Sequence, residues 1–92
     1  MTETVSRRLH IVNDKGLHAR ASAKFVELVE AHDATARVSR DGMDSDGDSI
    51  MGLLMLAAAS GSTIDVETSG HDAARLMDAL EALVADKFGE ES

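Results

Sequence analysis

The sequence contains no cysteine, no proline, no tryptophan and no tyrosine, and its only aromatic residues are Phe25 and Phe88. Without cysteine, the chain can form neither a disulfide nor a thiolate nucleophile, and it offers no cysteine ligand to a metal. No proline, linker or repeat divides the 92 residues, a length that suits one domain. We therefore expect a single domain spanning residues 1–92.

Long apolar segments are also missing. The longest, residues 50–59, is interrupted by Gly52 and is too short to span a bilayer. The charged residues near the N-terminus are not followed by the apolar core of a signal peptide. We therefore predict a cytoplasmic protein that does not act at a membrane.

Positive charge is scarce, because the net charge is −8. An acidic chain with few aromatic residues is a poor candidate for binding nucleic acid, which requires a basic surface. The charge is unevenly distributed. Residues 1–24 hold five basic and two acidic residues, a net +3, whereas residues 25–92 hold four basic and fifteen acidic residues, a net −11.

The spacing of apolar residues predicts both strands and helices. Strands are expected at residues 5–11, 34–38 and 64–67, and a short polar strand within the turn at 41–48. Helices are expected at residues 19–30, 50–58 and 72–87, with Gly61 ending the second. This β-α-β-β-α-β-α order predicts an α+β fold, a two-layer open-faced sandwich. Its four-stranded antiparallel sheet is covered on one face by three helices.

His18 lies where the loop at residues 13–16 enters the first predicted helix. The first N–H groups of a helix have no partner within it, and the helix dipole adds partial positive charge, so this end favours anions such as phosphate. We expect the backbone N–H groups of Ala19 and Arg20 to bind such an anion, and the Arg20 guanidinium to donate to its oxygens. Gly16 permits a positive φ angle or a close backbone approach.

A ring nitrogen of His18 in this position could attack a phosphoryl donor and form a phosphoramidate, an example of nucleophilic catalysis. The phosphoramidate bond is reactive enough for the group to pass onward. A histidine at the start of a helix is more often an ordinary polar surface residue. The position of His18 therefore does not establish this chemistry by itself.

Two motifs together are much more specific. Residues 16–20 read Gly-Leu-His-Ala-Arg, and residues 49–53 read Ser-Ile-Met-Gly-Leu. At this separation they resemble the HPr family, the histidine-containing phosphocarrier proteins of the bacterial phosphoenolpyruvate-dependent phosphotransferase system. The resemblance extends from Val5 to Val84, and the expected order of strands and helices agrees with the family fold.

The resemblance implies that His18 accepts a phosphoryl group on Nδ1 from phosphorylated enzyme I and passes it to an enzyme IIA-type protein. It implies that Arg20 stabilises the phosphate and that the protein is one component of a relay, not a self-sufficient enzyme. We expect no cofactor. One position departs from the family, which usually has proline where this chain has Ala21. Because alanine is a strong helix former, the helix should stay intact. The departure therefore concerns only the detailed conformation of the loop and which branch of the phosphotransferase system the protein serves.

Ser49 precedes an apolar run, in the position of a helix N-cap, where its hydroxyl would accept a free backbone N–H. The resemblance also implies that it is a regulatory serine, phosphorylated by HPr kinase/phosphorylase. Both roles are compatible, since a phosphate is tolerated at a helix N-terminus. Asp44, Asp46 and Asp48 would oppose the added negative charge.

A docking surface for the partners is also implied by the resemblance. Ile50, Met51 and Leu54 match the family's apolar patch beside the active site, and Leu17 could extend it. The competing interpretation is that these residues belong to the core. Met51 is the one most expected to be exposed, because methionine adapts to several partners. We expect the protein itself to be a monomer.

Other kinds of site fit the sequence poorly. Residues 44–48 resemble part of a calcium loop, but the register that places Gly47 correctly puts Leu53 where an acidic ligand is required. The four histidines lack the spacing of a metal site, and no P-loop pattern is present. The remaining alternative is a regulatory binding module of the nitrogen-related branch, whose phosphorylation state is read by non-transport partners. The negative net charge and the alanine at position 21 are compatible with that alternative.

Overall fold

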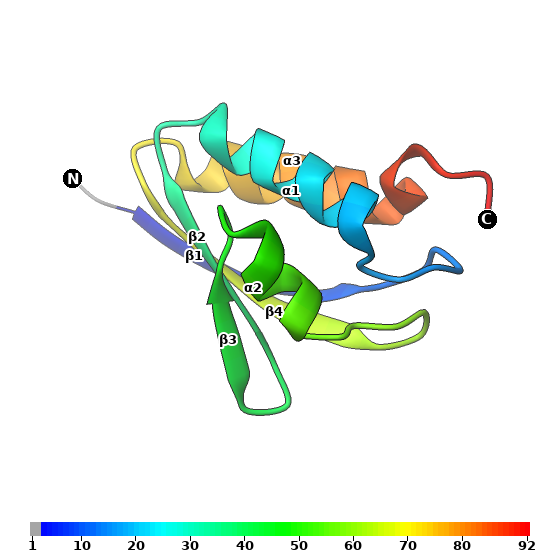
Figure 1. Cartoon of the computed structure of the whole chain (residues 1–92). Coiled ribbons are helices and arrows are strands. Elements are labelled where there is room, and N and C mark those ends of the chain that lie inside the picture. Colours follow the sequence, from blue (N-terminus) through cyan, green and yellow to red (C-terminus); the bar gives the residue numbers. More distant parts are fainter. Residues whose placement is uncertain (1–2) are drawn as a thin grey trace.

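The computed structural model describes residues 3–92, which fold into a sheet with helices on one face (Figure 1). The strands are β1 (Glu3–His10), β2 (Thr35–Arg40), β3 (Met43–Asp46) and β4 (Thr63–Gly70). The helices are α1 (Ala19–Glu30), α2 (Ile50–Met55) and α3 (Ala73–Ala85), followed by a short turn, η1 (Lys87–Gly89). No helix within residues 3–92 has the length and apolarity needed to cross a membrane.

The sheet has the strand order β1-β4-β2-β3, and every neighbouring pair is antiparallel. Strand β4 lies between β1 and β2, so the last strand of the chain separates the first two in the sheet. Figure 1 shows α1 and α3 side by side above the sheet, with α2 in the same layer near β3. This arrangement is the predicted open-faced sandwich, and the prediction of a short polar third strand is also confirmed.

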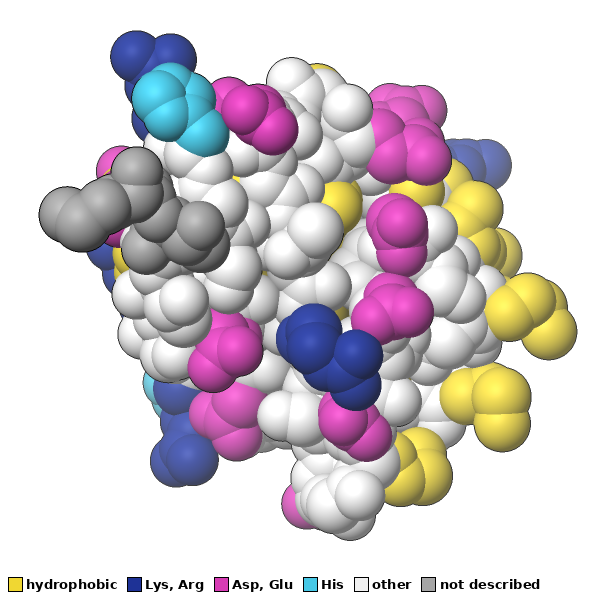
Figure 2. All heavy atoms as spheres, turned by 90° about the vertical axis from the view of Figure 1, so that its left-hand side faces the viewer, with side chains coloured by type: hydrophobic (Ala, Val, Ile, Leu, Met, Phe, Trp, Pro, Cys, Tyr) yellow, Lys and Arg dark blue, Asp and Glu magenta, His cyan; other side chains and the backbone are white. Residues whose placement is uncertain are grey.

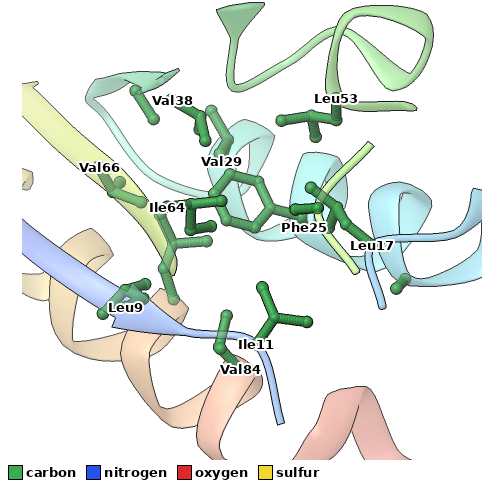
Figure 3. Close-up of a cluster of buried hydrophobic side chains, with 14 of the residues drawn as sticks. Leu9, Ile11, Leu17, Phe25, Val29, Val38, Leu53, Ile64, Val66 and Val84 are labelled. Atoms are coloured by element: carbon green, nitrogen blue, oxygen red, sulfur yellow. The ribbon is translucent and has the colours of Figure 1, made fainter. Parts of the chain in front are cut away.

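The core lies between the sheet and the helices, and the alternation along the strands determines which side chains enter it. Val38 pairs with Val66 and both are buried, whereas their neighbours Arg37 and Glu67 pair on the outer face and are exposed. Figure 3 shows the ring of Phe25 in the middle of the cluster, between side chains from the strands and from α1. The outer face of the sheet is therefore polar and the inner face apolar.

Two helices end earlier than the sequence predicts. The second was expected to continue from residue 50 to residue 58 and to end at Gly61, but α2 ends at Met55. Ala57 adopts a φ of 52°, which a continuing right-handed helix excludes. The third was expected to reach residue 87, but α3 ends at Ala85.

After α3 the chain turns back toward the start of α1. Lys87, Phe88 and Gly89 have φ angles of 56°, 56° and 80°, so the chain makes a left-handed turn that places the Phe88 ring in the core. The Lys24 Nζ donates a hydrogen bond to the Phe88 carbonyl at 2.5 Å, which fastens this turn to α1. Figure 1 shows the C-terminal segment, in red, beside the beginning of α1. The end of the chain is thus held against the region that contains His18.

We predict that Phe88→Ala lowers the free energy of unfolding by about 3–5 kcal/mol, because the substitution removes a fully buried ring and leaves a cavity. Urea unfolding followed by circular dichroism measures the loss. Met55→Ala is the matched control: the Met55 side chain is exposed, so the change should stay within about 0.5 kcal/mol of the parent protein. Equal stability of the two variants would show that Phe88, in the segment after α3, does not contribute to the stability of the core.

Candidate functional site: a histidine at the start of helix α1

His18 is the N-cap residue of α1, with φ −77° and ψ −178°. Its carbonyl accepts the Ser22 N–H at 2.8 Å, but its side chain does not cap the helix. The His18 side chain is partly exposed, with 27% of its surface accessible. Within residues 3–92, the N–H groups of Ala19 and Arg20 have no backbone acceptor, as expected for a first helical turn. The predicted start of the helix at residue 19 is confirmed.

The loop before His18 is held against the segment that follows α2. Gly16 has a φ of 65°, and a Cβ at this position would lie 2.5 Å from the Ala58 carbonyl oxygen. The Leu17 N–H donates to the same carbonyl at 2.9 Å. Gly16 thus serves both purposes for which the sequence proposed it, a positive φ and a close backbone approach. A shallow hollow of about 290 Å³ lies here, lined by Lys15, Leu17, His18, Leu54, Ala57, Ala58 and Ala59.

Glu90 forms a direct contact with the histidine. Its Oε2 lies 2.5 Å from the His18 Nε2, and its Oε1 accepts a hydrogen bond from the Asn13 Nδ2 at 3.0 Å. The Asn13 Nδ2 also donates to the Gly16 carbonyl at 2.8 Å, and Asn13 is fully buried. The hydrogen bond from His18, followed by that from Asn13, lowers the pKa of Glu90 below its usual value, while burial of the carboxyl opposes the shift.

Neither Glu90 nor Asn13 was among the site residues proposed from the sequence. Asn13 was assigned only to a loop, and Glu90 lies 72 positions after His18. No local motif links residues so far apart. The one sequence signal near Glu90 was Phe88, one of the two aromatic residues. An aromatic side chain is expected to be buried, but the sequence does not show which part of the fold covers it.

The basic residues near the N-terminus do not gather around His18. Arg7 forms ion pairs with Asp78 and Glu81 at 2.8 and 3.0 Å, and Arg8 pairs with Asp65 at 2.9 Å. Arg20, by contrast, is exposed and forms no ion pair or side-chain hydrogen bond with any residue in the described part of the chain. Arg20 is therefore available to an anion at the start of α1. Lys15, in the loop before His18, also lowers the pKa of Glu90.

Ser49 is the N-cap of α2, as predicted. Its Oγ accepts the Gly52 N–H at 3.0 Å, and the residue is half-buried. The sequence suggested that nearby carboxylates would oppose a phosphate on Ser49. In the fold, Arg37 pairs with two of them, Asp44 at 2.7 Å and Asp46 at 2.8 Å, so part of that negative charge is offset.

Three exposed side chains of α2, which we name the α2 patch, are Ile50, Met51 and Met55, the last two 69% and 70% exposed. Figure 2 shows hydrophobic side chains gathered along the right-hand edge of the molecule, the side on which α2 and β3 lie. Of the residues proposed for docking, Ile50 and Met51 belong to the α2 patch, and Leu54 is half-buried beside it. Met55 was missed, although it follows Met51 by one helical turn.

Leu17 requires a correction. The sequence suggested that it extends the docking surface, but only 4% of the residue is exposed. Figure 3 shows its side chain directed into the buried cluster beside Phe25. The reason is that Gly16 lies close to the Ala58 carbonyl and the Leu17 N–H donates to the same oxygen. These contacts hold the loop against the protein with the Leu17 side chain facing the core.

Comparisons with known proteins agree over nearly the whole chain. The family model described as the PTS HPr component phosphorylation site matches residues 5–86. The chain is 49% identical over 86 residues to the phosphocarrier protein HPr of Cupriavidus necator, covering 94% of this chain and 97% of that one. It is 37% identical over 89 residues to the phosphocarrier protein NPr of Proteus mirabilis, covering 96% and 99%. A crystal structure of HPr-C-His from Thermoanaerobacter tengcongensis superposes with a TM-score of 0.90 at 32% identity, covering 96% and 99%.

Proposed function

The chain belongs to the HPr family of phosphocarrier proteins of the phosphotransferase system, and from this premise we propose that it carries a phosphoryl group on His18. The group is accepted from phosphorylated enzyme I and delivered to an enzyme IIA-type protein. The protein acts as a monomer in the cytoplasm, as one step of a relay.

The observation that carries the proposal is the setting of the His18 ring. The ring is partly exposed at the start of α1, where unpaired N–H groups and the helix dipole favour the charge of a phosphoryl group. Arg20 has no other partner in the described chain, so its guanidinium can move to the phosphoryl oxygens without first breaking an ion pair. These groups stabilise the phosphate, and the shallow hollow at the site does not enclose it.

The α2 patch supports the protein–protein part of the proposal. Its methionines are exposed on α2, and Leu54 of the same helix lines a hollow together with His18. A partner that contacts His18 therefore also lies beside α2. Flexible methionine side chains suit a surface that must fit two different proteins in turn. Relatives named HPr are 35–49% identical to this chain and those named NPr are 37–39% identical, so a regulatory role in the nitrogen-related branch stays the second candidate.

Incubation with phosphoenolpyruvate and enzyme I is expected to add one acid-labile phosphate to the protein, and none to the His18→Ala variant. Arg20→Ala should still accept the group but more slowly, by roughly tenfold or more, because a donor to the developing charge is lost. Intact-protein mass spectrometry with a time course measures both. His71→Ala and Arg75→Ala change exposed residues of the same types and should behave as the parent protein. Phosphate on His18→Ala would refute the assignment.

Met51→Asp and Met55→Asp are expected to raise the enzyme I concentration that gives half-maximal transfer by about tenfold, because each places a charge in an apolar contact. Steady-state phosphorylation assays measure the shift. Ala74→Asp puts the same charge on an exposed position of α3 and serves as the control. If all three variants behave alike, the α2 patch is not where enzyme I binds.

For Ser49 we propose regulatory phosphorylation in addition to its capping role. HPr kinase/phosphorylase with ATP should add an acid-stable phosphate to the parent protein and to Ser60→Ala, but none to Ser49→Ala. Because the cap is lost, Ser49→Ala should also be less stable by about 1 kcal/mol. Phosphopeptide mapping and urea unfolding measure the two effects. An unmodified parent protein would contradict the regulatory proposal while leaving the cap unaffected.

A further inference from the structure

The contact between Glu90 and His18 determines which ring nitrogen carries a proton. An ionised carboxylate only accepts hydrogen bonds, so the His18 Nε2, at 2.5 Å from the Glu90 Oε2, must be the donor. A neutral imidazole has a single N–H, so the proton on Nε2 leaves the lone pair on Nδ1. Within residues 3–92, Nδ1 forms no hydrogen bond.

The position of Glu90 is determined by the fold around it, unlike that of an ordinary surface carboxylate. The buried Phe88 ring fixes the chain two residues earlier, and the Lys24 ammonium holds the Phe88 carbonyl. The Asp14 N–H donates to the Ser92 carbonyl at 3.1 Å, which fixes the chain two residues later. Asn13 then holds one carboxylate oxygen from the buried side, and only 19% of the Glu90 side chain is exposed. Such an anchored pair loses little side-chain entropy when it forms, in contrast to exposed ion pairs.

We propose that Glu90 is a positioning residue for phosphoryl transfer: held by Asn13, it keeps a proton on the His18 Nε2 and thereby presents Nδ1 as the nucleophile. The inference rests on the proposed function and adds to it a residue that acts through the histidine. The arrangement resembles the use of a buried carboxylate to orient a catalytic histidine in enzymes.

The carboxylate supports transfer in both directions. When the Nδ1 lone pair attacks phosphorus, an N–P bond forms, the bond from phosphorus to the donor breaks, and its electron pair stays with the donor. Nδ1 has no proton to lose, and the ring becomes a cation that retains its Nε2 proton, which Glu90 stabilises. When the group passes on, a nucleophile of the acceptor forms a bond to phosphorus, the N–P bond breaks, and its electron pair returns to Nδ1. The ring then leaves as neutral imidazole, a much better leaving group than the anion that would result without the Nε2 proton.

The geometry fits less well with a role in which Glu90 inhibits phosphoryl transfer to His18. The hydrogen bond from His18 to Glu90 is made by Nε2, and 27% of the His18 side chain stays exposed. The contact therefore orients the ring without engaging Nδ1, the nitrogen that reacts under the proposal.

Two substitutions at position 90 separate positioning from structural support. In Glu90→Gln, Asn13 still donates to residue 90, so the introduced amide places its carbonyl toward Asn13 and its NH₂ toward the His18 Nε2. Nε2 must then accept, which moves the proton to Nδ1 and blocks the nucleophile. Glu90→Ala removes the partner and leaves a mixture of tautomers. A purely structural role predicts the opposite order, since the amide keeps the shape of the carboxylate and alanine does not.

The test combines tautomer and rate. Long-range ¹H–¹⁵N correlation spectra of the unphosphorylated protein at about pH 9, where an ordinary histidine ring is neutral, report which nitrogen is protonated. We expect Nε2–H in the parent protein, a mixture in Glu90→Ala, and mainly Nδ1–H in Glu90→Gln. Single-turnover phosphorylation by enzyme I should slow by about tenfold in Glu90→Ala and about a hundredfold in Glu90→Gln.

Glu91→Gln is the matched control, because Glu91 is exposed and its side chain contacts no described residue through a hydrogen bond or ion pair. It removes the same charge one residue away and should match the parent protein in both measurements. The proposal is overturned if the tautomer is the same in all variants, if the rates do not follow the tautomers, or if Glu90→Ala accepts phosphate faster. It is also overturned if Glu91→Gln has the effect of Glu90→Gln.

Failure of the proposed function gives a different result. If the parent protein accepts no phosphate from enzyme I, the relay assignment fails whatever the spectra show. The tautomer measurement needs no phosphate donor, so it decides separately whether Glu90 sets the protonation of His18. Amide ¹H–¹⁵N spectra of each variant confirm folding, which we expect to persist because Glu90 lies outside the core and near the end of the chain.

Discussion

The hydrogen bond from the Leu17 N–H to the Ala58 carbonyl connects the two parts of the molecule on which the site depends. One end of this contact is the loop before α1, and the other is the segment just after α2. Only glycine at position 16 allows the approach, since any Cβ there would lie against the Ala58 oxygen. The contact brings the segment after α2 to the start of α1, and Leu54 of α2 lines a shallow hollow together with His18. Under the proposed function, a partner bound over this hollow contacts both helices.

Charge around His18 differs from what the sequence suggests. Two of the five basic residues in 1–24 are neutralised elsewhere, because Arg7 and Arg8 pair with carboxylates of α3 and β4. In this part of the described chain, Lys15 lines the hollow with His18, Lys24 binds the Phe88 carbonyl, Arg20 is unpaired, and the Glu90 carboxylate contacts the ring. A strongly basic surface would hold a phosphoryl group more tightly than a relay requires. A site with one free guanidinium and a helix N-terminus stabilises the group while leaving it accessible to the next protein.

Local features of this protein could be predicted from the sequence, and long-range ones could not. The periodic apolar residues located α1 to the residue, and the motif at residues 16–20 indicated His18 and Arg20 as candidate site residues, because a few neighbouring residues determine those features. The early end of α2 depends on the left-handed backbone of Ala57, for which an alanine gives no warning. The burial of Leu17 depends on a carbonyl contributed from residue 58. Glu90 reaches His18 only because Phe88 enters the core, a contact that no local pattern specifies.

These long-range contacts give the proposed site a division of roles between opposite charges. Arg20 and the helix N-terminus act on the phosphoryl oxygens, and Glu90 acts on the ring nitrogen that the phosphoryl group does not use. Under the proposal, phosphorylation turns a neutral ring into a cation beside an anion, so Glu90 is a stronger partner in the loaded state than in the empty one. Its attraction for the cationic ring preserves the Nε2 proton that makes imidazole a good leaving group. The same contact that helps the group to bind to Nδ1 therefore also helps it to leave, which is the requirement that distinguishes a carrier from an acceptor.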